Sequence, residues 1–530
     1  MTTAPLLHPE QTPTEVRAAI VAAGPTRFED LDPSDRAAVG VGKLRLVGVY
    51  DDRFEGTFMV RVRIPGGRVS ASQVEILAEI VEELCVRPEG SSEQDRFAEI
   101  TTRQDLQLHW IRFEALAELF RRFAEVGLSS LQACGNSMRN VTSCPVDGVD
   151  LASALDAGPV VESLDTFAQA EERLTAFLPR KFKIAVTGCR TDCVVARVNC
   201  LAFTPARRGA RTGFHVHVGG GLSDYPRLAT PLDFFVEPAQ VTAVVRAVID
   251  VFATLGDYEH ASVNRFRALV HELGPDRVER EIASRLAFPV AARGEDVSTW
   301  AAEDHIGVHP GRHNTSYVGL CVPVGRVTAA ELGELARLAR AHGDGGLRFT
   351  QRQNVILTGV ADPDALRAET LLERLRPEPD PFERAMLACT SAPFCKFGIL
   401  AMKPYGARLV EELRERIPPE GWGRLRGLRL HLSGCKASCA QVALAHIGLR
   451  ATMGKDGAGY FDAFDVALGG DAGAARLASW AHGGVEAASA FEAIGALLED
   501  VAEGRASLGS ITPEALENLD GALVPRWRSR

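Results

Sequence analysis

The sequence predicts an α+β protein built from two copies of one unit. Four segments of the first half recur in the same order about 250 residues later, a spacing far beyond that of a solenoid repeat. The matches are Gly67-Arg68-Val69 with Gly325-Arg326-Val327, TRQDLQL (102–108) with QRQNVIL (351–357), KIAVTGCRTDC (183–193) with RLHLSGCKASC (429–439), and, more weakly, HVHVGGG (215–221) with DVALGG (465–470). Four matches in one order indicate an internal duplication.

Each copy opens with a β-α-β pattern. A strand-like run, GTFMVRVRIPGG or TSYVGLCVPVG, meets a glycine-containing turn, and an amphipathic helix is predicted next, at 71–84 or 328–341. A second strand then carries TTRQDLQLHW or LRFTQRQNVIL. The later part of each copy alternates strands such as KFKIAVTG with helices such as PAQVTAVVRAVIDVFATLG, which indicates an α/β layer.

Length and composition exclude several classes of protein. The 530 residues exceed what one hydrophobic core usually organises, while 46% hydrophobic and 24% charged residues are ordinary for a globular protein. The N-terminus lacks the features of a secretory signal, and no apolar run approaches the roughly 20 residues of a membrane span. We therefore expect a cytoplasmic protein that does not enter a membrane. A net charge of −10 also disfavours nucleic acid as a partner.

Four cysteines near the C-terminus form the strongest motif of the chain. Cys389-x5-Cys395 is followed, after 39 residues, by Cys435-x3-Cys439. Two close pairs of thiolates can supply the four soft ligands of a [4Fe–4S] cluster, and the intervals are not those of a usual zinc site. Eleven cysteines without a secretory signal fit metal ligands and buried thiols better than a disulfide framework.

Six motifs follow one another between about Val47 and Gly470. They are TTRQxxQ, CGNxxRNVTxCP, LPRKFK, FHVxVGGG, C-x5-CK and SGC-x3-CAQ. This series resembles the siroheme-dependent nitrite and sulfite reductases. The resemblance implies two ferredoxin-like half-domains in a pseudo-twofold arrangement, flanked by two α/β domains, with siroheme touching a [4Fe–4S] cluster. It makes Cys389, Cys395, Cys435 and Cys439 the cluster ligands, with Cys439 shared with the siroheme iron.

The resemblance also divides the chain into five segments. We expect an N-terminal arm (1–45), a first ferredoxin-like half-domain (46–120), a first α/β domain that binds siroheme and holds the anion site (121–295), a second ferredoxin-like half-domain (296–375) and a second α/β domain that carries the [4Fe–4S] cluster (376–530). We expect the chain to act as a monomer.

Four cations of the first copy match the anion site of that family. Lys181 and Lys183 lie two residues apart in LPRKFKIAV, so on a strand both ammonium groups would face the same side. The resemblance places Arg103 of TTRQ and Arg139 of NSMRNVT beside them, above the siroheme. Such a quartet would bind a small oxyanion, polarise its bonds to oxygen and organise donated protons, so we assign it the catalytic role.

Further basic residues are expected to bind the siroheme. The macrocycle carries many carboxylates, so its pocket needs more basic groups than an ordinary haem site. The resemblance points to two arginine pairs, each expected on one strand face, to the lysine that follows Cys395, and to a glutamine near the haem. These residues are Arg61 and Arg63 in MVRVRIP, Arg265 and Arg267 in VNRFRALV, Lys396, and Gln107.

The electron donor is expected to be a separate protein. No flavin or nicotinamide module is visible, and the glycines of VGGG (218–221) lack both the G-x-G-x-x-G spacing and a P-loop lysine. Reduced ferredoxin is the simplest donor, and a flavoprotein reductase is the alternative. Because ferredoxins tend to be acidic, docking would need a local basic patch despite the net charge.

The cues to the substrate conflict. Lys183 in K-F-K resembles the sulfite-reducing branch, whereas CGNSMRNVTSCP, with Asn136, resembles the nitrite branch. Because a second lysine suits a dianion, we expect six-electron reduction of sulfite to sulfide, with nitrite reduction to ammonia as the alternative. Other interpretations are a precorrin-3B synthase-like monooxygenase and a non-catalytic iron–sulfur or zinc protein.

The first copy also retains cysteines of its own. Cys189-x3-Cys193 occupies the position of Cys435-x3-Cys439, while Cys134 and Cys144 lie in the segment that corresponds to the C-x5-C motif. Because Cys134-x9-Cys144 does not reproduce that spacing, we expect buried thiols here, with a second cluster as the alternative.

Overall fold

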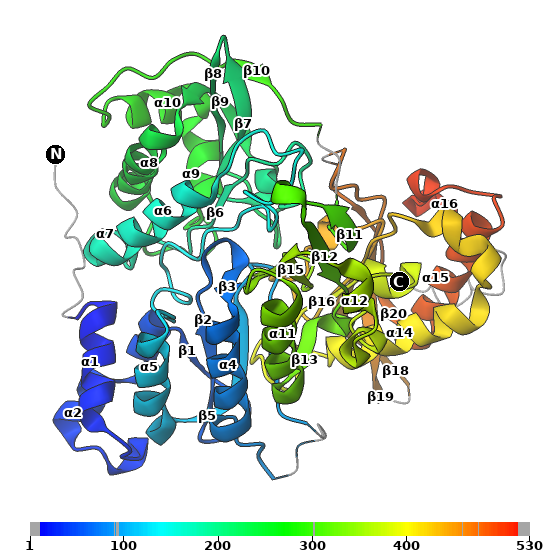
Figure 1. The fold of residues 1–530 in the computed structure, drawn as a ribbon, viewed down its shortest axis with the longest axis horizontal. Helices are drawn as coiled ribbons and strands as arrows, with labels where there is room; N and C mark the ends of the chain where they lie inside the picture. Colours follow the sequence, from blue (N-terminus) through cyan, green and yellow to red (C-terminus); the bar gives the residue numbers. More distant parts are fainter. Residues whose placement is uncertain are drawn as a thin grey trace.

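The computed structural model describes residues 11–89, 91, 95–299, 303–457, 459–474 and 476–517. In this part of the chain the strands form four five-stranded sheets, with helices packed against them (Figure 1). The predicted α+β class is therefore confirmed. Residues 1–10 of the predicted N-terminal arm and 518–530 of the last predicted domain lie outside the described residues.

Two antiparallel sheets form the ferredoxin-like pair, and each gives one edge strand to the other. The first runs in the order β1 (Val49–Asp51), β2 (Thr57–Val62), β5 (Leu106–Arg112), β4 (Phe97–Ile100) and β13 (Arg326–Thr328). The second runs in the order β11 (Gly307–Pro310), β12 (Ser316–Leu320), β15 (Val355–Val360), β14 (Gly346–Phe349) and β3 (Arg68–Ser70). The recurring Arg-Val segment of each copy is thus the edge strand of the other copy's sheet.

Each exchanged strand leads into a helix at the predicted position. α4 (Ala71–Leu84) follows β3 and α11 (Ala329–His342) follows β13, which confirms the helices expected at 71–84 and 328–341. A capping box begins both helices, because the hydroxyl of Ser70 or Thr328 accepts the backbone N–H of the third helical residue. The duplication therefore extends to the start signal of the helix.

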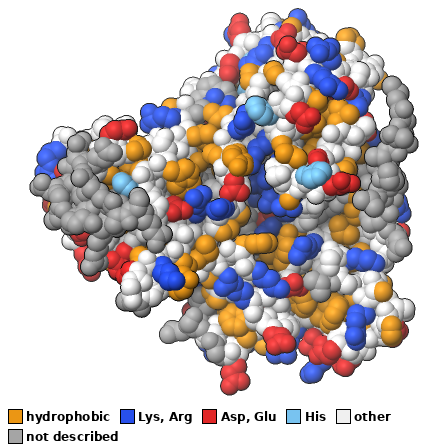
Figure 2. All heavy atoms as spheres, turned by 180° about the vertical axis from the view of Figure 1, so that it is seen from behind, with side chains coloured by type: hydrophobic (Ala, Val, Ile, Leu, Met, Phe, Trp, Pro, Cys, Tyr) orange, Lys and Arg blue, Asp and Glu red, His pale blue; other side chains and the backbone are white. Residues whose placement is uncertain are grey.

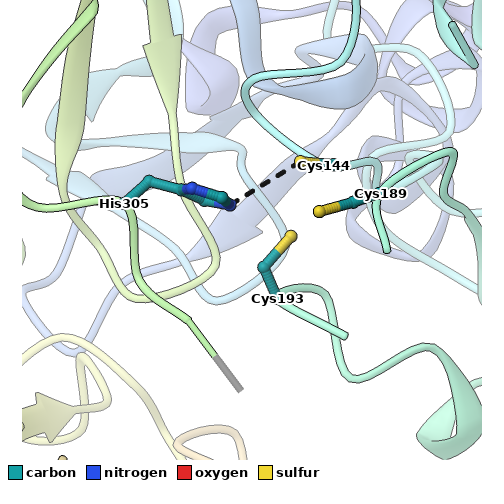
Figure 3. Close-up of side chains that lie close together, drawn as sticks. All are labelled: Cys144, Cys189, Cys193 and His305. Carbon is teal, nitrogen blue, oxygen red and sulfur yellow. Dashed lines mark hydrogen bonds between the residues drawn. The ribbon is translucent and has the colours of Figure 1, made fainter. Parts of the chain in front are cut away.

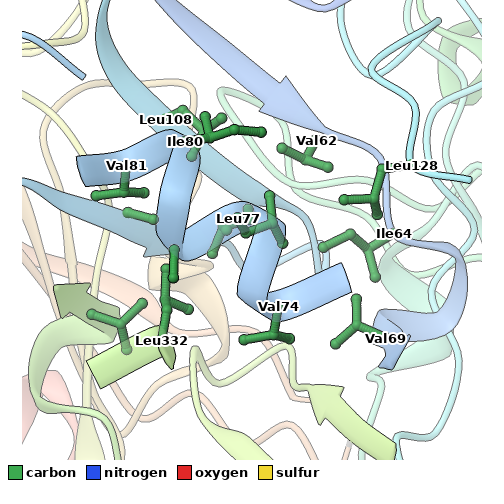
Figure 4. Packing of buried hydrophobic residues seen from close by; sticks show 14 of the residues in the cluster. Val62, Ile64, Val69, Val74, Leu77, Ile80, Val81, Leu108, Leu128 and Leu332 are labelled. Atoms are coloured by element: carbon green, nitrogen blue, oxygen red, sulfur yellow. The ribbon is translucent and has the colours of Figure 1, made fainter. Parts of the chain in front are cut away.

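One hydrophobic core runs through both copies. It contains Val74 and Leu77 of α4, Val62 and Leu108 of the first sheet, and Leu332 of α11, all fully buried (Figure 4). Full burial of such a side chain contributes about 1.5–3 kcal/mol, so separating the copies would expose a costly surface. The same core takes in buried residues of α1 (Pro13–Ala23), α3 (Val41–Leu44) and α5 (Leu116–Glu125), and α2 (Pro33–Ala38) packs against α1.

Two glutamine side chains at equivalent repeat positions also join the copies. Gln104 Nε2 donates to the carbonyl of Phe349 at 2.9 Å, and Gln353 Nε2 donates to the carbonyl of Ile100 at 2.9 Å. Each acceptor is the last residue of a strand in the opposite copy. Both glutamines have a positive φ, 61° and 63°, an uncommon conformation that marks these turns as constrained.

The first α/β unit lies at the top of Figure 1. Its sheet pairs β6 in parallel with β7, and then continues antiparallel through β8 and β9, with β10 on the other side of β7. The strands are β6 (Ile184–Val186), β7 (Leu201–Arg208), β8 (Arg211–Val218), β9 (Thr230–Val236) and β10 (Glu295–Asp296), and the helices are α6 (Gly158–Ala170), α7 (Glu172–Thr175), α8 (Val241–Leu255), α9 (Phe266–Leu273) and α10 (Pro275–Ala283).

The C-terminal unit repeats this arrangement. Its strands follow the chain order, parallel for the first three and antiparallel for the rest. They are β16 (Met386–Ala388), β17 (Leu430–Ser433), β18 (Ile447–Asp456), β19 (Gly459–Leu468) and β20 (Ser479–Glu486), with helices α13 (Pro381–Ala385), α14 (Met402–Arg416), α15 (Ala487–Ala502) and α16 (Pro513–Glu517) around them. α12 (Pro363–Arg367) packs against α11 in the ferredoxin-like core instead. β17 is the repeat counterpart of β6.

The strand predicted to carry the two lysines begins later than expected. β6 starts at Ile184, so Lys181 and Lys183 lie in the extended segment before it. There Phe182 pairs in parallel with Met138 through an isolated bridge. The alternation of buried and partly exposed side chains persists, and both lysines remain on the more open side of the segment.

The strand predicted for Arg265 and Arg267 is wrong, because VNRFRALV begins α9 instead. Arg265 is the N-cap residue and Arg267 lies in the first turn. Phe266, Leu269 and Val270 are buried at spacings of three and four residues, which is a helical period that overrides the short R-F-R alternation.

In the described part of the chain, one helix is long and apolar enough to cross a membrane. It covers Pro238–Leu255 with a mean hydropathy of 1.4. Its Val244, Val248 and Phe252 are fully buried in the core of the first α/β unit. Packing inside the protein therefore accounts for the apolar composition of this helix.

The contact between the copies predicts a specific loss of stability. Gly67 has φ +72°, and a Cβ there would lie 2.1 Å from the carbonyl oxygen of Phe349 in the other copy. We expect Gly67→Ala to destabilise the protein by about 3 kcal/mol or more, since a strained φ adds to a backbone clash. Urea unfolding followed by circular dichroism measures this change.

Gly127→Ala is the matched control. Gly127 has nearly the same φ, +69°, but a Cβ there has no neighbour within 4 Å. It should cost only the conformational strain of about 1–2 kcal/mol. Equal losses for the two variants would show that the close approach between the copies does not limit stability.

Candidate functional site

The four cysteines of the C-terminal copy come together at one edge of its sheet. Cys389 follows β16, and Cys435 and Cys439 lie in the loop after β17, the parallel neighbour of β16. Burial raises the pKa of the Cys389 thiol, and the neighbouring Cys439, Cys435 and Cys395 raise it further. Thiols that disfavour one another's ionisation in this way need a metal group to hold them as thiolates.

Polar contacts hold the loops of these cysteines in place. The backbone N–H of Gly434 donates to Cys389 Sγ at 3.1 Å. Arg53 of the first copy donates to the carbonyl of Cys395 at 3.1 Å. The Thr102 hydroxyl, also from the first copy, donates to the carbonyl of Cys439 at 2.8 Å. The cysteine loops are therefore anchored by the opposite copy as well as by their own sheet.

The predicted cations gather next to Cys439. The pKa of Lys183 is held well below its usual value by burial and then by Arg103 and Lys181. Burial also lowers the pKa of Lys181, to about 8, although Cys439 acts in the opposite direction. Arg139 is another neighbour that lowers the pKa of Lys181. Such mutual effects require that these groups lie close together in a poorly solvated place.

The two arginines of this group are fixed by the backbone. Arg103 donates to the carbonyl of Asn140 at 2.9 Å and to the side-chain oxygen of Asn199 at 2.5 Å. Arg139 donates to the carbonyls of Ala133 and Gly135, both at 2.7 Å. A guanidinium has five N–H donors, so each arginine keeps donors for a further acceptor.

The two lysines, unlike the arginines, are not held by hydrogen bonds within the part of the protein that the structure describes. Neither the Lys181 nor the Lys183 ammonium has a hydrogen bond or ion pair with another described residue. Both side chains remain partly exposed. They are thus available to an anion, and an anion would raise their pKa by supplying the missing negative charge.

Arg61 and Gln107 link the cation group to the cluster loop. Arg61 Nη2 donates to Gln107 Oε1 at 2.9 Å, and Gln107 Nε2 donates to the Thr390 hydroxyl at 2.9 Å, directly after Cys389. The Nε of Arg61 is buried without an acceptor among the described residues. A buried, unpaired guanidinium donor of this kind fits a carboxylate ligand.

Arg265 and Arg267, at the start of α9, both approach Gly221. A Cβ on Gly221 would lie 3.1 Å from Arg267 Nη1 and 3.8 Å from Arg265 Nη2. Arg267 Nη1 donates to the carbonyl of Leu222, whereas Arg265 Nε is buried without an acceptor in the described residues. These two arginines therefore offer a second place for an acidic group.

Two of the predicted basic residues have protein partners instead. Arg63 Nε pairs with Asp165 at 2.6 Å, and its side chain is only 2% exposed, although its Nη2 is buried without a partner among the described residues. Lys396 pairs with Asp51 at 3.0 Å, with 55% of its side chain exposed. Neither residue is among the main neighbours that shift the pKa of Lys181 or Lys183.

A buried ionic group behind the cluster loop was not foreseen from the sequence. Glu99 of β4 accepts from Arg326 Nε at 3.0 Å and lies 3.7 Å from Lys403 Nζ. The Thr390 hydroxyl donates to Glu99 at 2.5 Å. Burial alone would raise the pKa of Glu99, but Lys403, followed by His109 and Arg326, holds it well below its usual value. Its signal in the sequence was a single acid inside the apolar run FAEI.

Three thiols of the first copy converge on a histidine. Cys144, Cys189 and Cys193 are buried, as predicted, and their sulfur atoms and a His305 ring nitrogen lie within 4.8 Å of one another (Figure 3). Cys134 is not part of this group, since its Sγ lies near the carbonyl of Gly48. His305 carried no signal in the sequence, because it lies far from the cysteines along the chain.

The fold and the cysteine and cation groups define a metal-dependent redox enzyme. The chain matches the model of the nitrite/sulfite reductase ferredoxin-like half domain at residues 51–126 and 309–375, and the model of the nitrite and sulphite reductase 4Fe-4S domain at residues 134–290. The protein belongs to the nitrite and sulfite reductase family, whose cofactors are siroheme and a [4Fe–4S] cluster. The match to the 4Fe-4S domain model covers part of the first copy.

Relatives and a solved structure support this placement. The chain is 34% identical to the assimilatory ferredoxin-dependent nitrite reductase of Haloferax mediterranei, over 92% of this chain and 87% of that one. It is 36% identical to the ferredoxin–nitrite reductase of Synechococcus elongatus, over 84% and 86%. The NirA protein of Mycobacterium tuberculosis has a similar structure, with a TM-score of 0.86, 26% identity and coverage of 97% and 95%.

The described residues fit these cofactors. The four cysteines of the C-terminal copy lie near one another at one sheet edge, which suits the ligands of a cluster, and the unpaired donors of Arg61 and Arg265 suit the carboxylates of siroheme.

We expect Arg265→Gln to weaken siroheme binding about tenfold or more, since a hydrogen bond to a charged group contributes about 1.5–3 kcal/mol. The ratio of Soret absorbance to protein measures siroheme occupancy.

Lys396→Gln serves as the comparison for Arg265→Gln. Because Lys396 is exposed and paired with Asp51, its loss should leave the Soret ratio unchanged. A drop in siroheme for Lys396→Gln, or full occupancy for Arg265→Gln, would contradict the arrangement of basic groups inferred above.

Proposed function

We propose that the chain reduces nitrite to ammonia with six electrons drawn from reduced ferredoxin. The observation that carries this proposal is the identity of 34–36% to proteins named ferredoxin-dependent nitrite reductases, over more than four fifths of this chain. These names favour nitrite, the alternative in our sequence analysis, over sulfite, which we expected as the main substrate. Sulfite then becomes the competing substrate to test.

The lowered pKa of Lys183 reduces the preference for sulfite that its charge would give. We expected sulfite because a second lysine adds positive charge that suits a dianion. Burial, Arg103 and Lys181 hold its pKa well below the usual value, so its charge depends on what is bound beside it. A monoanion such as nitrite can therefore be accommodated without an excess of positive charge.

The residues around Cys439 take different parts in this proposal. Arg103 and Arg139, held by backbone carbonyls, orient the anion through their remaining N–H donors. Lys181, with a pKa of about 8, is protonated at neutral pH and close enough to its pKa to release a proton during the reaction. Siroheme and the cluster, when bound, supply the electrons one at a time.

Local charge is compatible with an acidic electron donor. The net charge of the chain is −10. Lys and Arg side chains nevertheless gather around the middle of the face shown in Figure 2. A basic region of this kind can attract both a small anion and an acidic ferredoxin, because local potential and net charge are independent.

Steady-state kinetics with reduced ferredoxin on nitrite and sulfite in parallel tests the proposal. We expect kcat/KM to be higher for nitrite than for sulfite, with ammonia as the product. A flavoprotein with NADPH, supplied as the alternative donor, should support a much lower rate. A higher kcat/KM for sulfite would overturn the assignment of nitrite as the substrate.

Lys183→Asn should shift the preference further toward nitrite. Removing a potential positive charge penalises a dianion more than a monoanion, and an interaction of about 1.5 kcal/mol corresponds to roughly tenfold in the ratio of kcat/KM values. Lys455→Asn, which removes a lysine at the end of β18, is the control and should leave the ratio unchanged. A ratio that moves toward sulfite in Lys183→Asn would refute this role of Lys183.

A further inference from the structure

A compact group of metal-binding side chains lies in the first copy, apart from the cysteines near the cations. The Sγ atoms of Cys144, Cys189 and Cys193 and a ring nitrogen of His305 all lie within 4.8 Å of one another. Figure 3 shows the four side chains pointing toward a common centre. In the described part of the chain, no other group of three or more Cys, His or acidic side chains has all its ligand atoms within 4.8 Å of one another.

Three separate segments supply these four side chains. Cys144 comes from the loop before α6, Cys189 and Cys193 from the loop after β6, and His305 from the segment that leads into β11 of the second copy. Around them lie the apolar side chains of Val146, Val194, Ala196, Ala202, Tyr317 and Ile356. The group is therefore closed to solvent and held by the tertiary structure.

The size of the group distinguishes a single ion from an iron–sulfur cluster. In a tetrahedral zinc site with Zn–S bonds of about 2.3 Å, ligand atoms lie roughly 3.8 Å apart. The distance from Cys144 Sγ to His305 Nε2 is 3.7 Å, and the longest separation in the group is within 4.8 Å. A [4Fe–4S] cluster binds each ligand through a different iron and needs a wider spacing and, as a rule, four cysteines.

The histidine is poorly satisfied without a metal. His305 is 3% exposed, and its ring has only weak sulfur partners, Cys144 Sγ at 3.7 Å from Nε2 and the thiol of Cys189. Its Nδ1 is buried and has no hydrogen-bond partner among the described residues. Burial of an imidazole without a strong acceptor or donor is costly, and coordination through Nε2 would offset that cost.

The cysteine sulfurs interact mainly with one another and with His305. Cys189 Sγ also lies 3.0 Å from the Thr191 hydroxyl, which could donate to a metal-bound thiolate. The three thiols have no disulfide partner, although their sulfur atoms lie close together. Three thiolates and one neutral imidazole form a ligand set common in structural zinc sites.

We propose that Cys144, Cys189, Cys193 and His305 bind one Zn²⁺ ion that fastens the start of the second copy to the loop after β6. Binding replaces the three thiol protons with the ion and transfers no electrons. The loop that would be fixed continues to Asn199, whose side-chain oxygen accepts from Arg103. The ion would thus stabilise a segment that positions a cation of the anion site.

Metal analysis of the purified holoenzyme tests the proposal directly. The enzyme, prepared without a metal-affinity step, should contain about one zinc atom per chain together with about five iron atoms from siroheme and one cluster. Substoichiometric zinc, or about four additional iron atoms in place of zinc, would overturn the proposal. This measurement does not depend on which anion the enzyme reduces.

Substitution of His305 separates a ligand from a merely buried ring. The backbone of His305 has φ +58°, a conformation that asparagine tolerates, so His305→Asn removes the ligand without adding backbone strain. We expect zinc to fall to a small fraction of one atom per chain, while the Soret ratio and iron content remain at the wild-type level. Unchanged zinc in His305→Asn would exclude His305 as a ligand.

Two further variants protect this test from a general folding defect. His305→Cys supplies another zinc ligand and should retain about one zinc atom per chain. Cys85→Ser alters a buried cysteine outside the group and should also retain zinc. Loss of zinc in Cys85→Ser would show that zinc content follows overall stability and would count against the assigned site.

Discussion

The reciprocal exchange of edge strands between the two copies is the constraint on which the site depends. β3 completes the sheet of the second copy, and β13 completes that of the first. The turn after β4, which carries Arg103, is thereby pressed against the opposite copy, where Gln104 bonds to Phe349. From this position Thr102 reaches the carbonyl of Cys439. Neither copy could build this junction alone, because the turn that carries Arg103 and the loop that carries Cys439 belong to different copies.

The buried ionic group around Glu99 connects the exchanged strand β13 to the loop that follows Cys389. Glu99 contacts Arg326 of the exchanged strand, Lys403 of α14 and the Thr390 hydroxyl beside Cys389. Removing charges from water is costly, so such a group is a poor source of stability in itself. The group instead fixes geometry. Because a buried charge without its partner is very unfavourable, arrangements of strand, helix and loop that break any of the three contacts are disfavoured.

Local patterns in the sequence predicted the features that depend on neighbours along the chain. The capping residues and apolar spacing of α4 and α11 lie within their own segments, so both helices could be predicted. The R-F-R alternation at Arg265 indicated a strand, but the helical spacing of the buried Phe266, Leu269 and Val270 places it at the start of a helix. The partner of Arg63 and the convergence of His305 on the first-copy thiols depend on tertiary packing, which no local pattern encodes.

The duplication places a cysteine loop after β6 and another after β17, and their surroundings give them different chemistry. Cys439 is exposed on the side of the cations, so a group bound there can exchange electrons and meet a substrate. Cys193 is buried in an apolar shell that His305 closes from the second copy. Open coordination suits catalysis and closed coordination suits structure. One repeated loop can therefore serve both purposes, since solvent access and ligand spacing, rather than the cysteines themselves, distinguish the two sites.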